Sequence, residues 1–469
     1  MDIEDKPKVV IIGAGPGGYT AAIRLGQYGL NPVVIEKEEI GGVCLNWGCI
    51  PTKTLYSTTE PLGKMESWKD RGIKVEGLDF DLEQITDYQE EVVDQLTGGV
   101  EKLIKAGGGE IVQGKAELLP GPKVQVNPES GEDFELNPEN VILATGSSPV
   151  ELPGFSFEKE DVWNSRDAVM PPEVPDQLMI LGAGVIGLEM GTLYSRLGSK
   201  VEILEMEDGI LPGMNLGRRF ESYLSRALKK EGIKVYTETR AAEIQSSPSE
   251  NVVIGEQDGE KKEFSADKVL VAVGRRPTLE SISTDLEVET SEDGSLETNA
   301  HCQTNQEGVY AIGDVAGGPL LAHKASREGL LAAASVAGED IRGYEHVPSV
   351  VFSDPEYAEV GLSEGEAEEA GYSISVGRFP FRASGKALAM DETDGMVQLV
   401  VDDDTDRILG GAVLGPGASD LIAEIGLAVE RGLTAGEVGE TIHAHPTLSE
   451  AVMEAAENVH GQAIHSGNR

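Results

Sequence analysis

Two of the three cysteines in this chain, Cys44 and Cys49, lie close together directly after a glycine-rich segment. A close thiol pair can hold two electrons as a disulfide and release them by thiolate exchange. A structural bridge over so short a loop would stabilise a large domain only slightly. Residues 1–8 are charged and lead at once into an apolar run, so no secretory signal is expected. Because disulfides in cytosolic proteins are usually catalytic or redox-sensing, we expect a redox-active pair in a cytoplasmic protein.

The backbone around these cysteines is not expected to be a regular helix. Positions five apart in a helix point about 140° away from each other. Pro51 cannot donate to the carbonyl of Trp47, so the helix near Cys49 must be distorted or begin there. A helix N-terminus would favour the thiolate, which is the reactive form. Lys53 lies one turn further on and could stabilise negative charge there, although a surface lysine is the usual alternative.

A histidine and a carboxylate near the C-terminus are candidates for acid–base chemistry. His445 would suit the deprotonation of a substrate thiol near neutral pH, and Glu450 could fix its tautomer. Thr447 and Glu450 also have the spacing of a capping box at a helix start, and the residues alone leave both roles open. His443 is expected to be a structural histidine.

Asp314 follows Gly313 at the end of a predicted buried strand. This position is the carboxyl edge of a strand, where open α/β sheets bind ligands. An ordinary turn aspartate is the alternative.

The elements that must position these groups occur twice in the chain. Residues 7–37 and 176–206 each contain an apolar strand, a glycine-rich turn, a helical segment, a further glycine and a second strand that ends in an acid. Five pairs of residues share one constant offset, namely Gly13/Gly182, Gly15/Gly184, Gly18/Gly187, Gly29/Gly198 and Glu36/Glu205.

Each copy has the physical features of a dinucleotide-binding unit. The first glycine permits a tight turn, the second lets the backbone approach a pyrophosphate, and the third lets helix and strand pack closely. The pyrophosphate would lie at the positive end of the helix, and Glu36 or Glu205 could bind a ribose diol. Residues 206–208 add acids beside Glu205, and no arginine occurs before Arg218. We therefore expect NAD rather than NADP in the second unit.

Composition restricts the class of protein further. The chain has 469 residues, which is enough for three or four domains, and no apolar run reaches the ~18 residues of a membrane span. With 38 basic and 82 acidic side chains, its net charge is −44. Such a surface repels nucleic acid and anionic membranes, so neither is expected as a partner. The acids are scattered, which favours a halophilic surface over a docking surface for a basic partner.

Together these segments resemble the two-cysteine flavoprotein disulfide reductases, and most closely the dihydrolipoyl dehydrogenases. The resemblance covers nearly the whole chain and is carried by residues 44–53, 144–146, 273–277, 313–314, 321–324 and 445–447. It implies an α/β fold with two Rossmann-like dinucleotide-binding domains and a C-terminal α+β dimerisation domain. The expected boundaries are 1–149 for the FAD-binding domain with the redox disulfide, 150–270 for the NAD-binding domain, 271–345 for the part completing the FAD domain, and 346–469 for the dimerisation domain. Within the first of these we expect a polar excursion over about residues 115–140.

The resemblance also implies roles for individual residues. Cys49 would lie against the flavin, Cys44 would exchange with substrate, and His445 would be the acid/base, oriented by Glu450. Lys53 would lie near the flavin, paired with Glu189. The residues expected at the two cofactors are Gly13, Gly15, Gly18, Glu36, Lys53, Ala116, Gly146, Asp314, Ala322, Gly182, Gly184, Gly187, Glu189, Glu205 and Gly274. No metal site is expected.

The implied reaction is oxidation of a dihydrolipoyl group on another protein, with electrons passing through the disulfide and FAD to NAD⁺. Each subunit would give its histidine to the partner's site, so an obligate homodimer is expected. The runner-up is an NAD(P)H-dependent reductase of glutathione or a related disulfide. Mercuric reductases and large thioredoxin reductases fit less well, because no thiol pair follows Cys302. From another class, a nucleotide-responsive regulatory protein without turnover is the alternative. The residues do not tell which lipoyl-bearing complex of oxoacid dehydrogenases or glycine cleavage is served.

Overall fold

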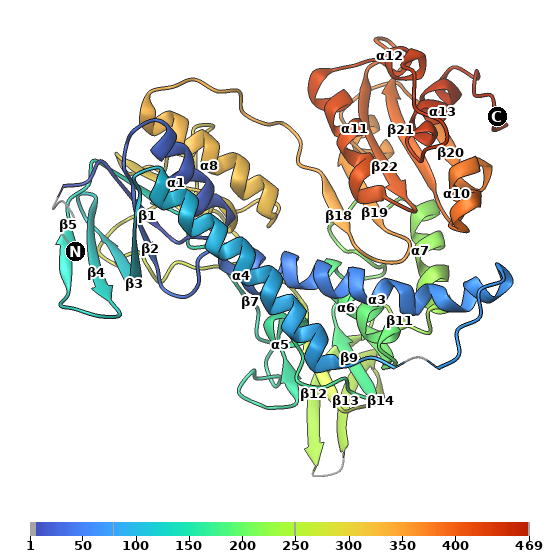
Figure 1. Ribbon diagram of the computed structural model, residues 1–469, viewed down its shortest axis with the longest axis horizontal. Coiled ribbons are helices and arrows are strands. Elements are labelled where there is room, and N and C mark those ends of the chain that lie inside the picture. Colours follow the sequence, from blue (N-terminus) through green and yellow to red (C-terminus); the bar gives the residue numbers. More distant parts are fainter. Residues whose placement is uncertain (1–5, 78, 248–249, 468–469) are drawn as a thin grey trace.

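The structure, a computed structural model, describes residues 6–77, 79–247 and 250–467. Two sheets built largely of parallel strands are followed by an antiparallel module at the C-terminus, which occupies the upper right of Figure 1. The expected fold class, two dinucleotide-binding units and a C-terminal α+β unit, is confirmed.

The first sheet has the strand order β17-β6-β1-β2-β3-β4-β5. Four of its strands are short apolar runs without an exposed residue, and they pair in parallel, as expected of a sheet covered on both faces. These strands are β1 (Val9–Ile12), β2 (Val33–Glu36), β6 (Asn140–Leu143) and β17 (Val309–Ala311).

The residues expected to form a polar excursion extend this sheet instead. The strands concerned are β3 (Glu110–Leu119), β4 (Lys123–Pro128) and β5 (Phe134–Leu136). β3 pairs in parallel with β2 and then in antiparallel fashion with β4. Every second residue of β3 from Val112 to Leu118 is buried, which is the pattern of a half-buried strand. The prediction of an excursion was wrong because β3 and β4 place apolar residues on a buried face and polar residues at the more exposed positions, an alternation that was missed in the sequence.

Two helices of the first module pack closely through glycines. They are α1 (Pro16–Gln27) and α8 (Ala322–Ala337). A Cβ on Gly329 would lie 2.5 Å from the carbonyl oxygen of Gly17, so a larger residue at position 329 would push the helices apart. Two further long helices, α3 (Cys49–Asp70) and α4 (Leu82–Ala106), cross the middle of the molecule in Figure 1.

The second sheet is wholly parallel, with the order β11-β10-β9-β15-β8. Its strands are β8 (Val162–Trp163), β9 (Gln177–Leu181), β10 (Lys200–Leu204), β11 (Lys234–Tyr236) and β15 (Lys268–Val271). Its helices are α5 (Ser165–Val169), α6 (Val185–Arg196) and α7 (Arg218–Lys230). An antiparallel sheet adjoins it, formed by β12 (Arg240–Ser247), β13 (Glu250–Gln257) and β14 (Glu260–Ala266). The two strands that connect this module with the first are β7 (Ser147–Pro149) and β16 (Arg275–Pro277).

The C-terminal module is an antiparallel sheet of order β18-β19-β22-β21-β20 with helices packed on it. The strands are β18 (Ser349–Val351), β19 (Tyr357–Gly361), β20 (Ile374–Pro380), β21 (Met396–Asp402) and β22 (Ile408–Leu414). The helices are α9 (Glu364–Glu369), α10 (Gly385–Met390), α11 (Ala418–Arg431), α12 (Ala435–Glu440) and α13 (Glu450–Val459). In the described part of the chain, no helix has the length and hydropathy of a membrane span.

Candidate active site

The chain bends between the two cysteines because two helices meet there. α2 (Gly42–Trp47) carries Cys44, and α3 begins with Cys49. Of the two arrangements expected from Pro51, a distorted helix or a helix that begins near Cys49, the structure has the second. Gly48 separates the helices with φ −134° and ψ −117°, and a Cβ there would lie 2.7 Å from the carbonyl oxygen of Val43. The break brings the two thiols into hydrogen-bonding contact.

The two thiols differ in acidity. The hydrogen bond from Cys44 lowers the pKa of Cys49 to about 7; burial opposes this shift and the charge of Lys53 reinforces it. The same hydrogen bond, together with burial, raises the pKa of Cys44. Cys49 also stands at the positive end of α3. Its side chain is accessible from one direction although protein atoms surround it on most sides. Cys49 is therefore the more acidic thiol of the reduced pair and the one that ionises near neutral pH.

Lys53 forms the expected ion pair with Glu189. Its Nζ lies 3.0 Å from Oε1 and 2.8 Å from Oε2 of Glu189, and 4.3 Å from the centroid of the Phe352 ring. The backbone N–H of Phe352 donates to Oε1 of Glu189 at 3.1 Å. The contact thus joins α3, α6 and the segment after β18, one element from each module, next to Cys49.

The two glycine-rich turns are geometric copies, as the sequence repeat predicts. Gly13 and Gly182 have φ values of 103° and 104°, in the left-handed region that favours glycine. A Cβ on Gly18 would lie 1.9 Å from the carbonyl oxygen of Gly13, and one on Gly187 would lie 2.0 Å from that of Gly182. The close approach at the third glycine is therefore to the backbone of the turn itself.

The acid at the end of the second strand in each unit is buried and bound to the turn. One carboxylate oxygen of Glu36 accepts the N–H of Ala14 at 2.6 Å, and one of Glu205 accepts the N–H of Ala183 at 2.7 Å. Each second oxygen accepts a backbone N–H two residues further along the chain. Burial raises the pKa of Glu36 in spite of these bonds. Both carboxylates keep free lone pairs with which to accept a ribose hydroxyl.

The surfaces at these turns fit dinucleotides. A Cβ placed on Gly15, Gly184, Gly146 or Gly274 would meet no atom of the described residues within 4 Å, so a ligand can approach the backbone there. No side chain caps the helices that begin after Gly15 and Gly184. Their first N–H groups are therefore directed toward a site for a pyrophosphate.

Asp314 lies in the 3₁₀ turn η1 (Gly313–Ala316), beyond the carboxyl end of β17, where the sequence predicts it. Ser147 Oγ donates to its Oδ2 at 2.5 Å, and Arg275 Nε donates to Ser147 Oγ at 2.8 Å. Burial lowers the pKa of Arg275, and the charges of Asp314 and Cys49 partly offset this. Ser147 and Arg275 were missed by the sequence analysis, since their contact joins distant positions. Their only signal was that Arg275 follows Gly274 in a recognised segment.

The two alanines expected at the cofactors differ in their surroundings, since one begins a helix and the other lies in the apolar core. Ala322 is the first residue of α8, which packs against the η1 turn that carries Asp314. The side chain of Ala116 is buried in the apolar core beneath β3, so only its main chain could meet a ligand.

His445 and Glu450 lie together, but not as a complete capping box. His445 Nδ1 lies 2.9 Å from Oε1 of Glu450, and Oε2 of the same carboxylate accepts the N–H of Thr447 at 2.9 Å. The hydroxyl of Thr447 donates to the carbonyl of Ala444, and α13 begins only at Glu450. Glu450 thus makes the contact expected for orienting His445 and one of the two hydrogen bonds expected of a capping box. The ring of His443 is bound to Thr441 and Glu424, as expected of a structural histidine.

His445 and the thiols lie on different modules of the chain. Its side chain is 78% exposed and lies on the C-terminal module, whereas the thiols lie on the first module. α13 packs on β20, β21 and α12 of its own module. Within the described part of the chain, the side-chain contact of His445 is therefore to Glu450 of its own module.

Comparison with known proteins agrees with this organisation. Residues 7–329 match the family model "Pyridine nucleotide-disulphide oxidoreductase", and residues 347–456 match the model of the dimerisation domain of that family. The chain is 44% identical over 476 aligned positions to the dihydrolipoyl dehydrogenase of Halobacterium salinarum, covering 100% of this chain and 99% of that one. It is 45% identical to the dihydrolipoyl dehydrogenase of Thermus scotoductus, with 98% and 99% covered. Among solved structures, LpdA from Mycobacterium tuberculosis superposes with a TM-score of 0.89 at 25% identity, with 96% of this chain and 99% of that chain covered.

These matches define an enzyme class, the oxidoreductases that link a pyridine nucleotide to a disulfide. The chain belongs to the pyridine nucleotide-disulphide oxidoreductase family, and its C-terminal module is the dimerisation domain of that family.

Proposed function

We propose that this protein oxidises dihydrolipoyl groups carried by another protein chain, using the Cys44–Cys49 pair, FAD and NAD⁺. The paired thiols at the junction of α2 and α3 carry the proposal, since they are poised for disulfide exchange. Full-length relatives that are 39% to 45% identical are named dihydrolipoyl dehydrogenases, which supports the choice of substrate.

The exchange steps follow from the difference between the two thiols. Turnover starts from the Cys44–Cys49 disulfide. A substrate thiolate attacks Cys44 Sγ, forming a mixed disulfide and releasing Cys49 as a thiolate. The lower pKa of Cys49 favours this direction, because the more acidic thiol is the better leaving group. The second substrate thiol then displaces Cys44, which leaves a disulfide on the substrate and two electrons on the cysteine pair.

The proton of the substrate thiol needs an acceptor. His445 of the partner subunit takes it through Nε2, since Glu450 holds Nδ1 and thereby fixes the reactive nitrogen. Lys53 stabilises the negative charge that appears on Cys49. FAD and NAD⁺, when bound, would supply the hydride chemistry that takes up the electron pair held by the cysteines.

The residues that would hold FAD come from the first module. The turn from Gly13 to Gly18 would bind the pyrophosphate, Glu36 the ribose and Asp314 the ribityl chain, with Ala322 approaching the flavin through its backbone. In the second module, the turn from Gly182 to Gly187 would bind the NAD pyrophosphate. Glu205 would bind its ribose.

The proposal includes a homodimer, because His445 is exposed on the dimerisation domain, from which it could reach the thiols of a partner chain. We further infer a cytoplasmic enzyme, since a cytosolic dithiol pair is typically catalytic. The net charge of −44 supports a surface adapted to high salt, as does the similarity to a Halobacterium relative.

A steady-state assay with free dihydrolipoamide and NAD⁺ in concentrated salt tests the function. Cys44→Ser should abolish turnover while the protein keeps its flavin. Cys302→Ser is the matched control, because this third thiol is buried away from the pair and should leave the rate near that of the unmodified enzyme. Full activity in Cys44→Ser would refute the assignment, and faster turnover with NADPH and glutathione disulfide would favour the alternative reductase.

A further inference from the structure

A buried ion pair in α8 is used by none of the proposed steps. Lys324 and Glu328 are 5% and 6% exposed, and Lys324 Nζ lies 3.1 Å from the carboxylate of Glu328. Neither side chain is among the residues expected at the cofactors. A charge pair removed from water so completely calls for a physical reason.

The pair holds both backbone polar groups of one residue. Glu328 Oε2 accepts the N–H of Gly313 at 2.7 Å, and Lys324 Nζ donates to the carbonyl of Gly313 at 3.3 Å. Gly313 has φ +73°, and a Cβ there would lie 3.2 Å from the Cβ of Ala325 in α8. Gly313 directly precedes Asp314, so the pair determines the place of Asp314 relative to α8.

Stability alone does not account for this arrangement. Lys324 lies in the first turn of α8, where the positive end of the helix disfavours a cation. Replacement of a buried ion pair by apolar residues is often neutral or stabilising, whereas removal of one partner is harmful. The pair is therefore better explained by the geometry that it imposes than by the energy that it contributes.

We propose that Lys324 and Glu328 are positioning residues for the flavin: they clamp η1 to the start of α8 and so hold Asp314 and Ala322 in register. This inference rests on the proposed function, in which both of those residues meet FAD. The clamp also lies against α1, because a Cβ on Gly17 would be 3.1 Å from the carbonyl oxygen of Ala325. The helix that receives the pyrophosphate thus shares the same framework.

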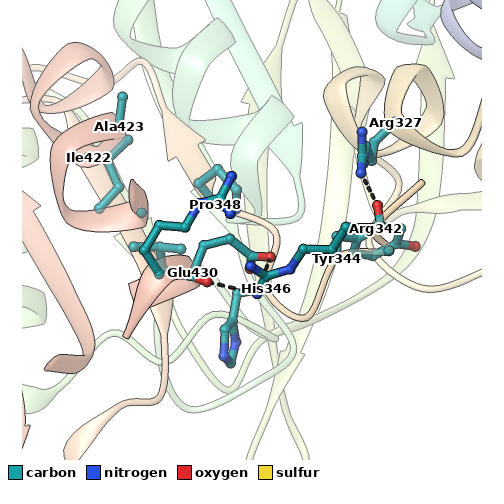
Figure 2. A pocket seen from close by; sticks show the side chains of 12 residues that line it. Arg327, Arg342, Tyr344, His346, Pro348, Ile422, Ala423 and Glu430 are labelled. Atoms are coloured by element: carbon teal, nitrogen blue, oxygen red, sulfur yellow. Dashed lines mark hydrogen bonds and ion pairs between the residues drawn. The ribbon is translucent and has the colours of Figure 1, made fainter. Parts of the chain in front are cut away.

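The clamp formed by Lys324 and Glu328 also contacts the segment that joins the first and C-terminal modules. Tyr344 Oη donates to Glu328 Oε1 at 2.6 Å, so each oxygen of this carboxylate has a partner. Arg327, also on α8, donates to the carbonyl of Arg342 (Figure 2). Tyr344 lines a cavity of about 400 Å³ between α8 and α11, so its ring faces the cavity while its hydroxyl reaches inward. Tyr344→Phe therefore weakens the clamp without leaving a charge unpaired.

The test uses the full-length chain with its flavin removed and then added back. The double variant Lys324→Met/Glu328→Gln leaves no unpaired buried charge. It should bind FAD at least tenfold more weakly, with altered circular dichroism of the bound flavin, and its unfolding midpoint without FAD should stay within a few degrees. Tyr344→Phe should show a smaller change in the same direction, and Lys324→Arg should retain most of the affinity. Lys268→Met is the matched control, because Lys268 is an equally buried, ion-paired lysine in the second module.

The outcomes separate the clamp from the function on which it rests. FAD affinity and dichroism unchanged within twofold in the double variant and in Tyr344→Phe would overturn the clamp. Equal losses in Lys268→Met would do the same, because they would reflect general destabilisation. If the double variant does not fold, the FAD affinities of Tyr344→Phe and Lys324→Arg still test the clamp. Failure of the unmodified chain to bind FAD would instead overturn the proposed function.

Discussion

The carboxylate of Glu450 reaches His445 with one oxygen and the backbone ahead of α13 with the other. The distance from His445 Nδ1 to Oε1 is 2.9 Å, and the N–H of Thr447 lies 2.9 Å from Oε2. Burial would raise the pKa of Glu450, but these two hydrogen bonds hold it below its ordinary value. The carboxylate is therefore ionised near neutral pH, and it holds the imidazole through Nδ1.

Substitutions at this pair should separate orientation from capping. His445→Gln should lower kcat by about 10²–10⁴-fold, the usual contribution of a general base. Glu450→Gln can still accept the N–H of Thr447 but no longer offers a carboxylate to the histidine, so we expect a smaller loss of kcat than in His445→Gln. His443→Asn serves as the control and should stay near the rate of the unmodified enzyme. Unchanged kcat in Glu450→Gln would reduce Glu450 to a helix-terminal residue.

The acidity of Cys49 should respond in opposite directions to its two charged neighbours. Lys53 lowers the pKa of Cys49 and Glu189 raises it, from a starting value of about 7 in the reduced pair. Lys53→Met should therefore raise that pKa, and Glu189→Gln should lower it. A pH titration of thiolate absorbance in the reduced protein measures both effects, with the thiolate present above the pKa and lost below it. Shifts of the same sign in the two variants would contradict the assigned electrostatics.

The nucleotide units could be predicted because their geometry is local. The glycines act within a few residues of their own turn, as the left-handed φ of Gly13 and Gly182 illustrates. Each acid binds its turn from 22 residues away, but the constant spacing of the two copies made that contact recognisable. The contacts that the sequence did not disclose join distant positions. Arg275 donates a hydrogen bond to Ser147 across the β7–β16 pair, and the sequence of neither segment predicts this contact.

The burial of Lys324 and Glu328 also could not be predicted from the sequence. Lys324 and Glu328 have the ordinary spacing of a surface ion pair on a helix, yet the packing of α8 against α1 and η1 encloses them. The β3–β5 meander was missed because only the number of polar residues was weighed, and not their alternation with apolar residues along β3 and β4.

Coenzyme choice should be adjustable at the end of β10. Glu205 is bound to the turn, and Met206 beside it is 62% exposed. An arginine at this place could bind the 2′-phosphate of NADP⁺, and a charge-assisted hydrogen bond is worth roughly 1.5–3 kcal/mol. Met206→Arg should thus raise kcat/KM for NADP⁺ by about tenfold or more. Leu388→Arg adds the same charge to an exposed site of the C-terminal module and should leave the preference for NAD⁺ as it is.

Substitution of the third glycine in each turn should distinguish the FAD-binding unit from the NAD-binding unit. Alanine at position 18 or 187 would put a Cβ 1.9 or 2.0 Å from a backbone oxygen that cannot move without opening the turn. Gly18→Ala should therefore prevent FAD binding, whereas Gly187→Ala should keep the flavin but lose reduction of NAD⁺. Gly191→Ala is the control, since its Cβ would meet only side-chain carbons at 3.3 Å and beyond. Flavin absorbance and NADH formation distinguish the three variants. If Gly187→Ala lost its flavin while Gly18→Ala kept it, the two units would have to exchange their assigned cofactors.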